Sequence, residues 1–214
     1  MPNFDLSFTL DQLQQAASNI YQTMLPTPQY NWPQLCQQTG CDVWVKHENH
    51  TPTTAFKVRG GINLVNNLMR STDRPKGIIS ATRGNHGQSL SFAAKRAGLP
   101  VTIVVPECNN VDQNRAIECF GANLVIHGED FEAARQYSQQ LQQNNGYRHV
   151  PPFERDLVLG VATYALEFFS AVKDLDTVYV AVGMGSGISG LIKTRDLLGL
   201  STKIVGVVAQ GAPT

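Results

Sequence analysis

The sequence lacks an excess of charge of either sign, because 17 lysine and arginine residues balance 17 acidic residues. Nucleic acids and anionic membranes usually select proteins with a basic surface, so we expect neither as a partner. Long apolar runs are missing too, and no stretch approaches the roughly 18 residues of a membrane span. The opening segment, MPNFDLSFTLDQLQQ, has neither the basic nor the apolar part of a signal peptide. We therefore expect a cytoplasmic protein.

Cysteine is also scarce. The four cysteines are Cys36, Cys41, Cys108 and Cys119. They form no C-x-x-C pair and no zinc-like spacing, and a chain of 214 residues can build its own core without disulfides. His47 and His50 in KHENH have no third candidate ligand nearby, so we interpret them as polar loop residues. We predict reduced thiols and no bound metal.

From Val43 onward, short apolar runs alternate with longer segments of helical period. The expected strands are residues 43–46, 77–80, 101–105, 123–126, a short piece around 149, 178–182 and 203–208. The expected helices are residues 56–69, 86–97, a segment through 117 and 120, a segment from 131, 160–169 and 188–198. This alternation predicts an α/β fold of parallel twisted sheets with helices on both faces. The pair Pro151–Pro152 follows the most polar stretch and is the best candidate for a crossing between lobes.

A glycine-rich loop, GMGSGISG, follows the expected strand 178–182. Parallel sheets bind ligands beyond the carboxyl ends of their strands, so this is where a site is expected. Its first five residues are Gly183, Met184, Gly185, Ser186 and Gly187. Such a loop before a helix lets backbone N–H groups converge on an anion, of which phosphate is the natural choice. A simple tight turn is the structural alternative.

The same loop also satisfies the dinucleotide pattern G-x-G-x-x-G over residues 185–190. That pattern requires an acidic residue at the end of the next strand, where this chain has Ala209 and Gln210. A P-loop is excluded because no G-K-[ST] follows the glycines. We therefore favour a phosphate group over a dinucleotide.

The stretch TPTTAFKVRGG places Lys57 on one helix face with Gly60 and Gly61. A lone lysine near a helix start is usually a solvated surface residue. Each glycine in a helix interior costs about 1 kcal/mol, which favours a second interpretation in which a flat molecule approaches the amine. In partly apolar surroundings the pKa of a lysine falls, and the amine becomes a nucleophile able to form a Schiff base. A reactive lysine and a phosphate cradle are together what pyridoxal 5′-phosphate requires.

Three motifs, TPTTAFKVRGG, SATRGNHGQSLSFAAKRAGLPVTIVVPE and VAVGMGSGISG, make the chain resemble the fold type II pyridoxal-phosphate enzymes. It looks most like their serine/threonine dehydratase branch, from about Thr27 to the last residue. The resemblance implies two lobes. Residues 1–70 would be the first part of the large lobe, 71–149 a small inserted lobe, and 150–214 an incomplete second part of the large lobe.

The resemblance also implies roles for individual residues. Lys57 would form the Schiff base with pyridoxal 5′-phosphate, Phe56 would pack beside the cofactor, and Asn85 would hydrogen-bond its ring hydroxyl. Backbone amides of the phosphate loop, Gly183, Met184, Gly185, Ser186 and Gly187, would hold the phosphate. The substrate carboxylate would be received by the loop of Thr82, Arg83, Gly84, Asn85 and His86, which precedes a helix and so suits an anion.

The sequence departs from the family pattern at several positions. Arg83 stands where dehydratases have a small residue and where racemases have the serine that acts as a second base, which argues against racemisation. Arg83 could pair with a second substrate carboxylate or the cofactor phosphate, or point into solvent. Val208 replaces an acidic metal ligand of the racemase-like members. Thr54-Ala55 replaces Gly-Ser before Phe-Lys, and two loop glycines are replaced by Met184 and Ser186.

The resemblance implies that the enzyme dehydrates and deaminates L-threonine or L-serine to a 2-oxo acid and ammonia, as a dimer or larger homo-oligomer. Family members continue well beyond VVAQGAPT, so we expect a truncated form. One alternative is β-replacement of the cysteine synthase type, although those enzymes usually have Thr-Gly where GNHGQ has His-Gly. Another is a catalytically silent fragment.

Overall fold

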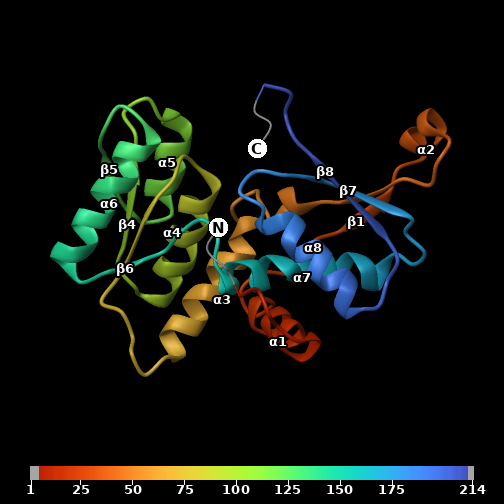
Figure 1. The fold of residues 1–214 in the computed structure, drawn as a ribbon, viewed down its shortest axis with the longest axis horizontal. Helices are drawn as coiled ribbons and strands as arrows, with labels where there is room; N and C mark the ends of the chain where they lie inside the picture. Colours follow the sequence, from red (N-terminus) through yellow and green to blue (C-terminus); the bar gives the residue numbers. More distant parts are fainter. Residues whose placement is uncertain (1–4, 212–214) are drawn as a thin grey trace.

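A computed structural model describes residues 5–211 of the chain (Figure 1). The α-helices are α1 (Leu10–Ile20), α2 (Pro33–Thr39), α3 (Lys57–Arg70), α4 (Asn85–Ala97), α5 (Val111–Cys119), α6 (Phe131–Asn145), α7 (Arg155–Ala171) and α8 (Ser186–Leu197), with a short 3₁₀ helix η1 (Glu48–His50). The strands are β1 (Gln29–Asn31), β2 (Trp44–Lys46), β3 (Ile78–Ala81), β4 (Val101–Val105), β5 (Asn123–Ile126), β6 (Arg148–His149), β7 (Thr177–Ala181) and β8 (Lys203–Val207). None of the helices in this part of the chain is both long and apolar enough to cross a membrane.

The largest sheet has the strand order β5-β4-β3-β6, and all of its pairs are parallel. Its two central strands are buried on both faces. Ile78 packs into one core with Leu90 of α4, whereas its neighbour Ile79 packs with Ala134 of α6. Helices therefore cover both faces of the sheet, as Figure 1 shows at the left of the molecule. This confirms the α/β fold class.

The strands β7 and β8 form a second parallel pair, in register from Thr177 with Lys203 to Ala181 with Val207. The glycine-rich loop connects β7 to α8, so it leaves the carboxyl end of its strand as expected. Pro151–Pro152 lies between β6 and α7, where the chain leaves the four-stranded sheet. The division into lobes at residues 1–70, 71–149 and 150–214 remains a prediction.

Helices α3, α7 and α8 fill the middle of the molecule (Figure 1). Gly60 of α3 lies so close to α7 that an added Cβ would be 2.8 Å from the carbonyl oxygen of Leu157. Gly160 of α7 lies equally close to α3, because a Cβ added to it would be 2.5 Å from the carbonyl oxygen of Arg59. Only glycine allows two backbones to approach this closely.

The N-terminal elements were not predicted. Helix α1 begins with a capping box, in which Thr9 and Gln12 each accept a hydrogen bond from the other's backbone N–H. The short strands β1 and β2 pair antiparallel, and α2 lies between them in sequence, far from the four-stranded sheet (Figure 1). The alternation of strands and helices begins only at Val43, so it gives no signal for these elements.

Candidate active site

Lys57 is the first residue of α3, and its amine lies beside the first residue of α8. The Nζ atom donates a hydrogen bond to Oγ of Ser186 at 3.3 Å, across 129 residues of sequence. The Nζ atom also lies 5.6 Å from the centre of the Phe56 ring. Desolvation by burial lowers the pKa of Lys57. A lowered pKa favours the neutral, nucleophilic amine, as the sequence interpretation requires.

The glycine-rich loop ends directly at the N-terminus of α8. Gly185 adopts a left-handed conformation with φ of 94°, which L side chains rarely adopt. An added Cβ at Gly183 would have no heavy atom within 4 Å, so this part of the loop is open. Among residues 5–211, no hydrogen bond uses the backbone N–H groups of residues 183–187. Unused donors at the positive end of a helix form an anion site.

Tyr164 of α7 connects this loop to Phe56. Its hydroxyl donates to the carbonyl oxygen of Gly187 at 3.1 Å, and its ring lies 6.0 Å from the Phe56 ring, tilted by 52°. An added Cβ at Gly187 would lie 3.4 Å from the Phe56 ring. Burial raises the pKa of Tyr164, so the hydroxyl stays protonated and remains a donor. Phe56, Tyr164 and Gly187 thus form one packed unit beside Lys57.

The predicted substrate loop connects β3 to α4. Thr82 is buried, and its Oγ1 accepts a hydrogen bond from the N–H of Gly84 at 3.3 Å. Arg83 and Asn85 are exposed. The loop is therefore accessible to a small ligand at these two positions, while its base is held inside the protein.

His86 is buried and carries the clearest unsatisfied polar atom of the site. Its Nε2 has no hydrogen-bond partner within the described residues. Desolvation, and then the charge of Lys57, lower its pKa to about 3. His86 is therefore neutral at physiological pH. One turn further along α4, Ser89 Oγ donates to the carbonyl oxygen of Lys57 at 2.7 Å and ties the two helix starts together.

The structure thus brings four predicted site residues into direct contact: Lys57, Phe56, Ser186 and Gly187. The substrate loop is linked to Lys57 through α4. No hydrogen bond or ion pair among residues 5–211 joins Arg83 or Asn85 to Lys57. Their roles remain predictions.

The expectation that Gly60 and Gly61 leave room for a flat molecule is wrong. Helix α7 covers Gly60, and Ser89 of α4 covers Gly61, where an added Cβ would lie 2.6 Å from the serine carbonyl oxygen. The two glycines allow α3 to pack between α4 and α7. They position the helix that carries Lys57 rather than exposing its amine.

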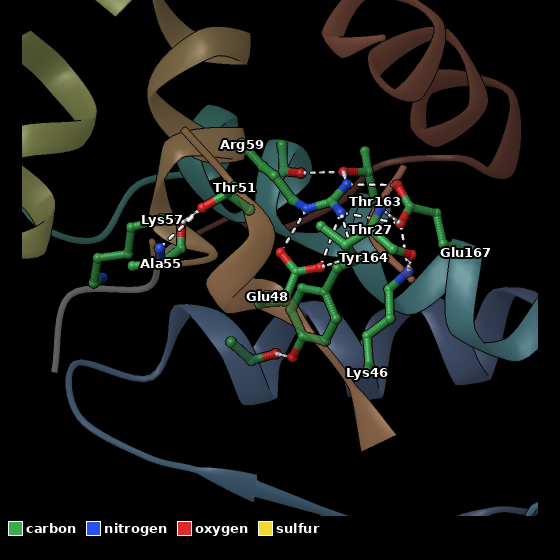
Figure 2. A network of polar contacts seen from close by, with 12 residues as sticks. Thr27, Lys46, Glu48, Thr51, Ala55, Lys57, Arg59, Thr163, Tyr164 and Glu167 are labelled. Atoms are coloured by element: carbon green, nitrogen blue, oxygen red, sulfur yellow. Dashed lines mark hydrogen bonds and ion pairs between the residues drawn. The ribbon is translucent and has the colours of Figure 1, made fainter. Parts of the chain in front are cut away.

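A buried network of charges, which the sequence did not reveal, lies on the other side of α3 (Figure 2). Arg59 has no exposed surface and pairs with Glu48 at 2.7 Å and with Glu167 at 2.6 Å. Lys46 pairs with the other oxygen of Glu167 at 2.6 Å. Burial acts to lower the pKa of Arg59, but hydrogen bonds to the two carboxylates raise it overall. Two cations and two anions thus balance inside the protein.

This network connects η1, α3 and α7. Glu167 accepts hydrogen bonds from both Nη atoms of Arg59, which gives this carboxylate a structural role. One feature of the sequence could have indicated that Arg59 is buried. It is a charged residue between Val58 and two glycines, on a helix whose residues are mostly buried. Its partners could not be identified without the fold, because Glu167 is 108 residues away.

His47 and His50 lie close together at the short helix η1. Their ring centres are 5.5 Å apart, and Nε2 of His47 accepts a hydrogen bond from Trp32 at 3.2 Å. In the part of the chain that the structure describes, no three histidine, cysteine or acidic residues gather as a metal site would require. The four cysteines are unpaired.

The residues present fit pyridoxal 5′-phosphate. One end of the site has a lysine amine with a lowered pKa, and the other end has unused N–H groups at a helix start. Phe56 supplies an aromatic surface beside the amine. The unpartnered Nε2 of His86 leaves a hydrogen-bonding atom for a further polar group.

Comparison with known sequences points to the same chemistry. Residues 20–214 match the family of pyridoxal-phosphate dependent enzymes. The catabolic L-threonine dehydratase of Staphylococcus aureus is 33% identical over 204 residues, which are 94% of this chain and 59% of that protein. The threonine dehydratase of Nicotiana attenuata is 30% identical over 197 residues, which are 92% of this chain and 33% of that protein. The chain thus spans only part of the length of these relatives.

Solved structures show the same fold. The serine racemase from Dictyostelium discoideum superposes with a TM-score of 0.87 at 29% identity, over 95% of this chain and 66% of that chain. The processed form of threonine deaminase isoform 2 from Solanum lycopersicum gives a TM-score of 0.83 at 28% identity, over 96% of this chain and 58% of that chain. This chain belongs to the pyridoxal-phosphate dependent enzymes and has the α/β fold of their type II members.

Proposed function

We propose that the whole enzyme removes water from L-threonine or L-serine and releases a 2-oxo acid and ammonia. The observation that supports this most directly is the hydrogen bond between Lys57 Nζ and Ser186 Oγ at 3.3 Å. It places an amine with a lowered pKa beside a helix start whose N–H groups are unused among the described residues. The similarity to threonine dehydratases at about 30% identity supports the reaction class.

In this proposal the backbone N–H groups of residues 183–187 hold the cofactor phosphate, and Phe56 packs against the ring. Asn85 hydrogen-bonds the ring hydroxyl. Bound pyridoxal 5′-phosphate would delocalise the negative charge that remains on the substrate when its Cα proton is lost. Lys57 accepts that proton, because burial favours its neutral form. The ammonium form of Lys57 can return this proton to the substrate hydroxyl, which then leaves as water.

The loop from Thr82 to His86 would receive the substrate carboxylate at the N-terminus of α4, where the helix dipole favours an anion. His86 cannot attract the carboxylate by charge, because its pKa of about 3 keeps it neutral. Arg83 is the exposed cation of this loop. A substrate with a second carboxylate would be the one most affected by its removal.

Covalent trapping tests the assignment of Lys57. Incubation with pyridoxal 5′-phosphate followed by borohydride should attach the cofactor to Lys57, as identified by peptide mass spectrometry. Lys57→Ala should lose the attachment, whereas Lys76→Ala, a change at an exposed lysine, should keep it. Equal labelling of Lys57→Ala and wild type would disprove the assignment.

Two alternatives make different predictions. β-Replacement of the cysteine synthase type would consume sulfide and a β-substituted amino acid, whereas dehydration releases a 2-oxo acid without sulfide. A catalytically silent protein would not retain the cofactor on gel filtration. The chain spans 59% of the Staphylococcus aureus relative, so the full-length protein is the form in which activity should be assayed.

We propose a small amino acid as the substrate, a dimer or larger homo-oligomer, and a cytoplasmic location. Neither a nucleic acid nor a membrane is part of the proposed function, since the formal net charge is +0.

A further inference from the structure

The side chain of Ser186 is a feature of the site that phosphate binding through backbone N–H groups does not require. Backbone N–H groups can bind a phosphate whatever side chain this position carries. In this chain Ser186 is 2% exposed and its Oγ lies 3.3 Å from Lys57 Nζ. A hydroxyl group has therefore been placed against the reactive amine.

The surroundings of Lys57 offer few other hydrogen-bond acceptors. His86 on α4 is neutral, and its charged form is disfavoured by burial and by Lys57 itself. On α7, the hydroxyl of Tyr164 donates to Gly187, and the carboxylate of Glu167 pairs with Arg59. Within residues 5–211, Ser186 Oγ is the only hydrogen-bond partner of the Lys57 amine.

We propose that Ser186 is a positioning residue, whose hydroxyl orients the free amine of Lys57 for proton transfer. The inference rests on the proposed function, in which Lys57 accepts the Cα proton. A lysine side chain has a flexible four-carbon stem with rotatable bonds, so an amine without a hydrogen-bond partner samples many positions. One hydrogen bond from the amine to Ser186 Oγ restricts those positions and leaves the nitrogen lone pair available for the proton.

The protons balance in this scheme. The neutral amine donates one N–H to Ser186 Oγ and accepts the Cα proton on its lone pair, which converts it to an ammonium group. Ser186 keeps its own proton throughout and only accepts a hydrogen bond. Because the ammonium form is the stronger donor, the hydroxyl also stabilises the product of the transfer.

The first test uses the protein without cofactor. The pKa of Lys57 is measured by NMR titration of carbon-13-labelled lysine side chains, with Lys57→Arg used to assign the signal. Ser186→Ala should lower this pKa by about one unit, because the ammonium form loses its acceptor. Ser186→Thr keeps a hydroxyl and should restore the wild-type value. The matched control is Ser189→Ala, one turn further along α8, which should leave the pKa unchanged.

The second test uses the full-length enzyme with cofactor. Ser186→Ala should lower kcat by roughly tenfold to a hundredfold, the effect expected when a proton-transferring group is misplaced. KM and cofactor affinity should change less than twofold, since backbone N–H groups hold the phosphate. If Ser186→Ala does not fold, Ser186→Gly, which also removes the hydroxyl, takes its place in both tests.

The two tests separate the inference from the proposed function. An unchanged Lys57 pKa in Ser186→Ala overturns the inference, whatever the enzyme catalyses. An unchanged kcat overturns it as well. If wild type fails the borohydride test while the Lys57 pKa still responds to Ser186→Ala, the proposed function fails and the hydroxyl contact stands without a catalytic role.

Discussion

The Nη1 atom of Arg59 lies 2.6 Å from Oε1 of Glu167, and this buried pair joins the helix of Lys57 to the helix of Tyr164. Arg59 is two residues from Lys57, and Glu167 is three residues from Tyr164. Tyr164 in turn holds Gly187 at the start of α8. Helix α7 therefore contacts both the helix that carries the Lys57 amine and the phosphate loop, and it fixes their relative positions.

Removing the charge of Arg59 should destabilise the protein strongly. Arg59→Met leaves Glu48 and Glu167 buried without their main partner, and breaking a buried pair costs about 3–5 kcal/mol. Urea unfolding measures this loss. Arg135→Met breaks the exposed pair with Glu132 and should leave the unfolding midpoint unchanged. Equal midpoints for the two variants would contradict the structural role of the network.

The Tyr164 hydroxyl should matter for cofactor binding. Tyr164→Phe keeps the ring contact with Phe56 but removes the donor to Gly187, with an expected stability loss of about 1 kcal/mol. Affinity for pyridoxal 5′-phosphate, measured by fluorescence titration, should fall severalfold because the loop is less well held. Tyr179→Phe, on an exposed tyrosine, is the control and should affect neither quantity.

Stability should decline as the pH falls from 6.5. His86 has a pKa of about 3 in the folded protein against 6.5 when unfolded, so the unfolded chain binds an extra proton between these values. Burial lowers the pKa of His149 too, which acts in the same direction. Urea unfolding between pH 7 and pH 5 measures the slope. His86→Asn should reduce the slope of the unfolding free energy against pH by an amount equal to the uptake of up to one proton. A slope identical to that of the wild type would refute the assignment.

Because α3 packs closely on α4, even an added methyl group between them should lower the stability of the protein. Gly61→Ala would place a Cβ against Ser89 of α4, and overpacking of this kind costs about 1–3 kcal/mol. The control is Gly183→Ala, whose Cβ would meet no heavy atom within 4 Å and should leave thermal stability unchanged. An unaltered unfolding temperature in Gly61→Ala would show that the helices can separate easily.

The protein should be more stable when glycine replaces Thr54. Its φ of 54° lies in the left-handed region, which costs a residue with a Cβ about 1–2 kcal/mol and which glycine tolerates. After the greater entropy of glycine in the unfolded chain is subtracted, Thr54→Gly should gain about 0.5–1 kcal/mol in urea unfolding. Thr54→Ala keeps the Cβ and should gain less. A loss of stability in Thr54→Gly would mean that the threonine side chain contributes more than the strain removes.

Several elements of the fold could be predicted because their signals are local. The apolar runs at 101–105 and 123–126 coincide with β4 and β5, and the glycines before α8 mark its start to within two residues. Helix α1 was missed although its capping box is also local, since Thr9 and Gln12 lie in a stretch without neighbouring strand signals.

The face of α3 shows where local reasoning fails. The spacing of Lys57, Gly60 and Gly61 is visible in the sequence, but which partner lies against the two glycines is not. The structure places α7 and Ser89 there instead of a ligand. A small residue reports only that something approaches closely, and a helix backbone fits that description as well as a cofactor does.

The sequence by itself determined the α/β class, the lysine at the start of a helix and the phosphate-type loop, because periodicity, turn residues and motif spacing act over a few neighbouring positions. Only the tertiary structure decided that Ser186 is the group facing the Lys57 amine and that Arg59 is neutralised by Glu48 and Glu167. The contacts of Lys57 with Ser186 and of Arg59 with Glu167 span more than 100 residues of sequence. They arise because α3, α7 and α8 pack into one buried centre, where most polar groups need a partner.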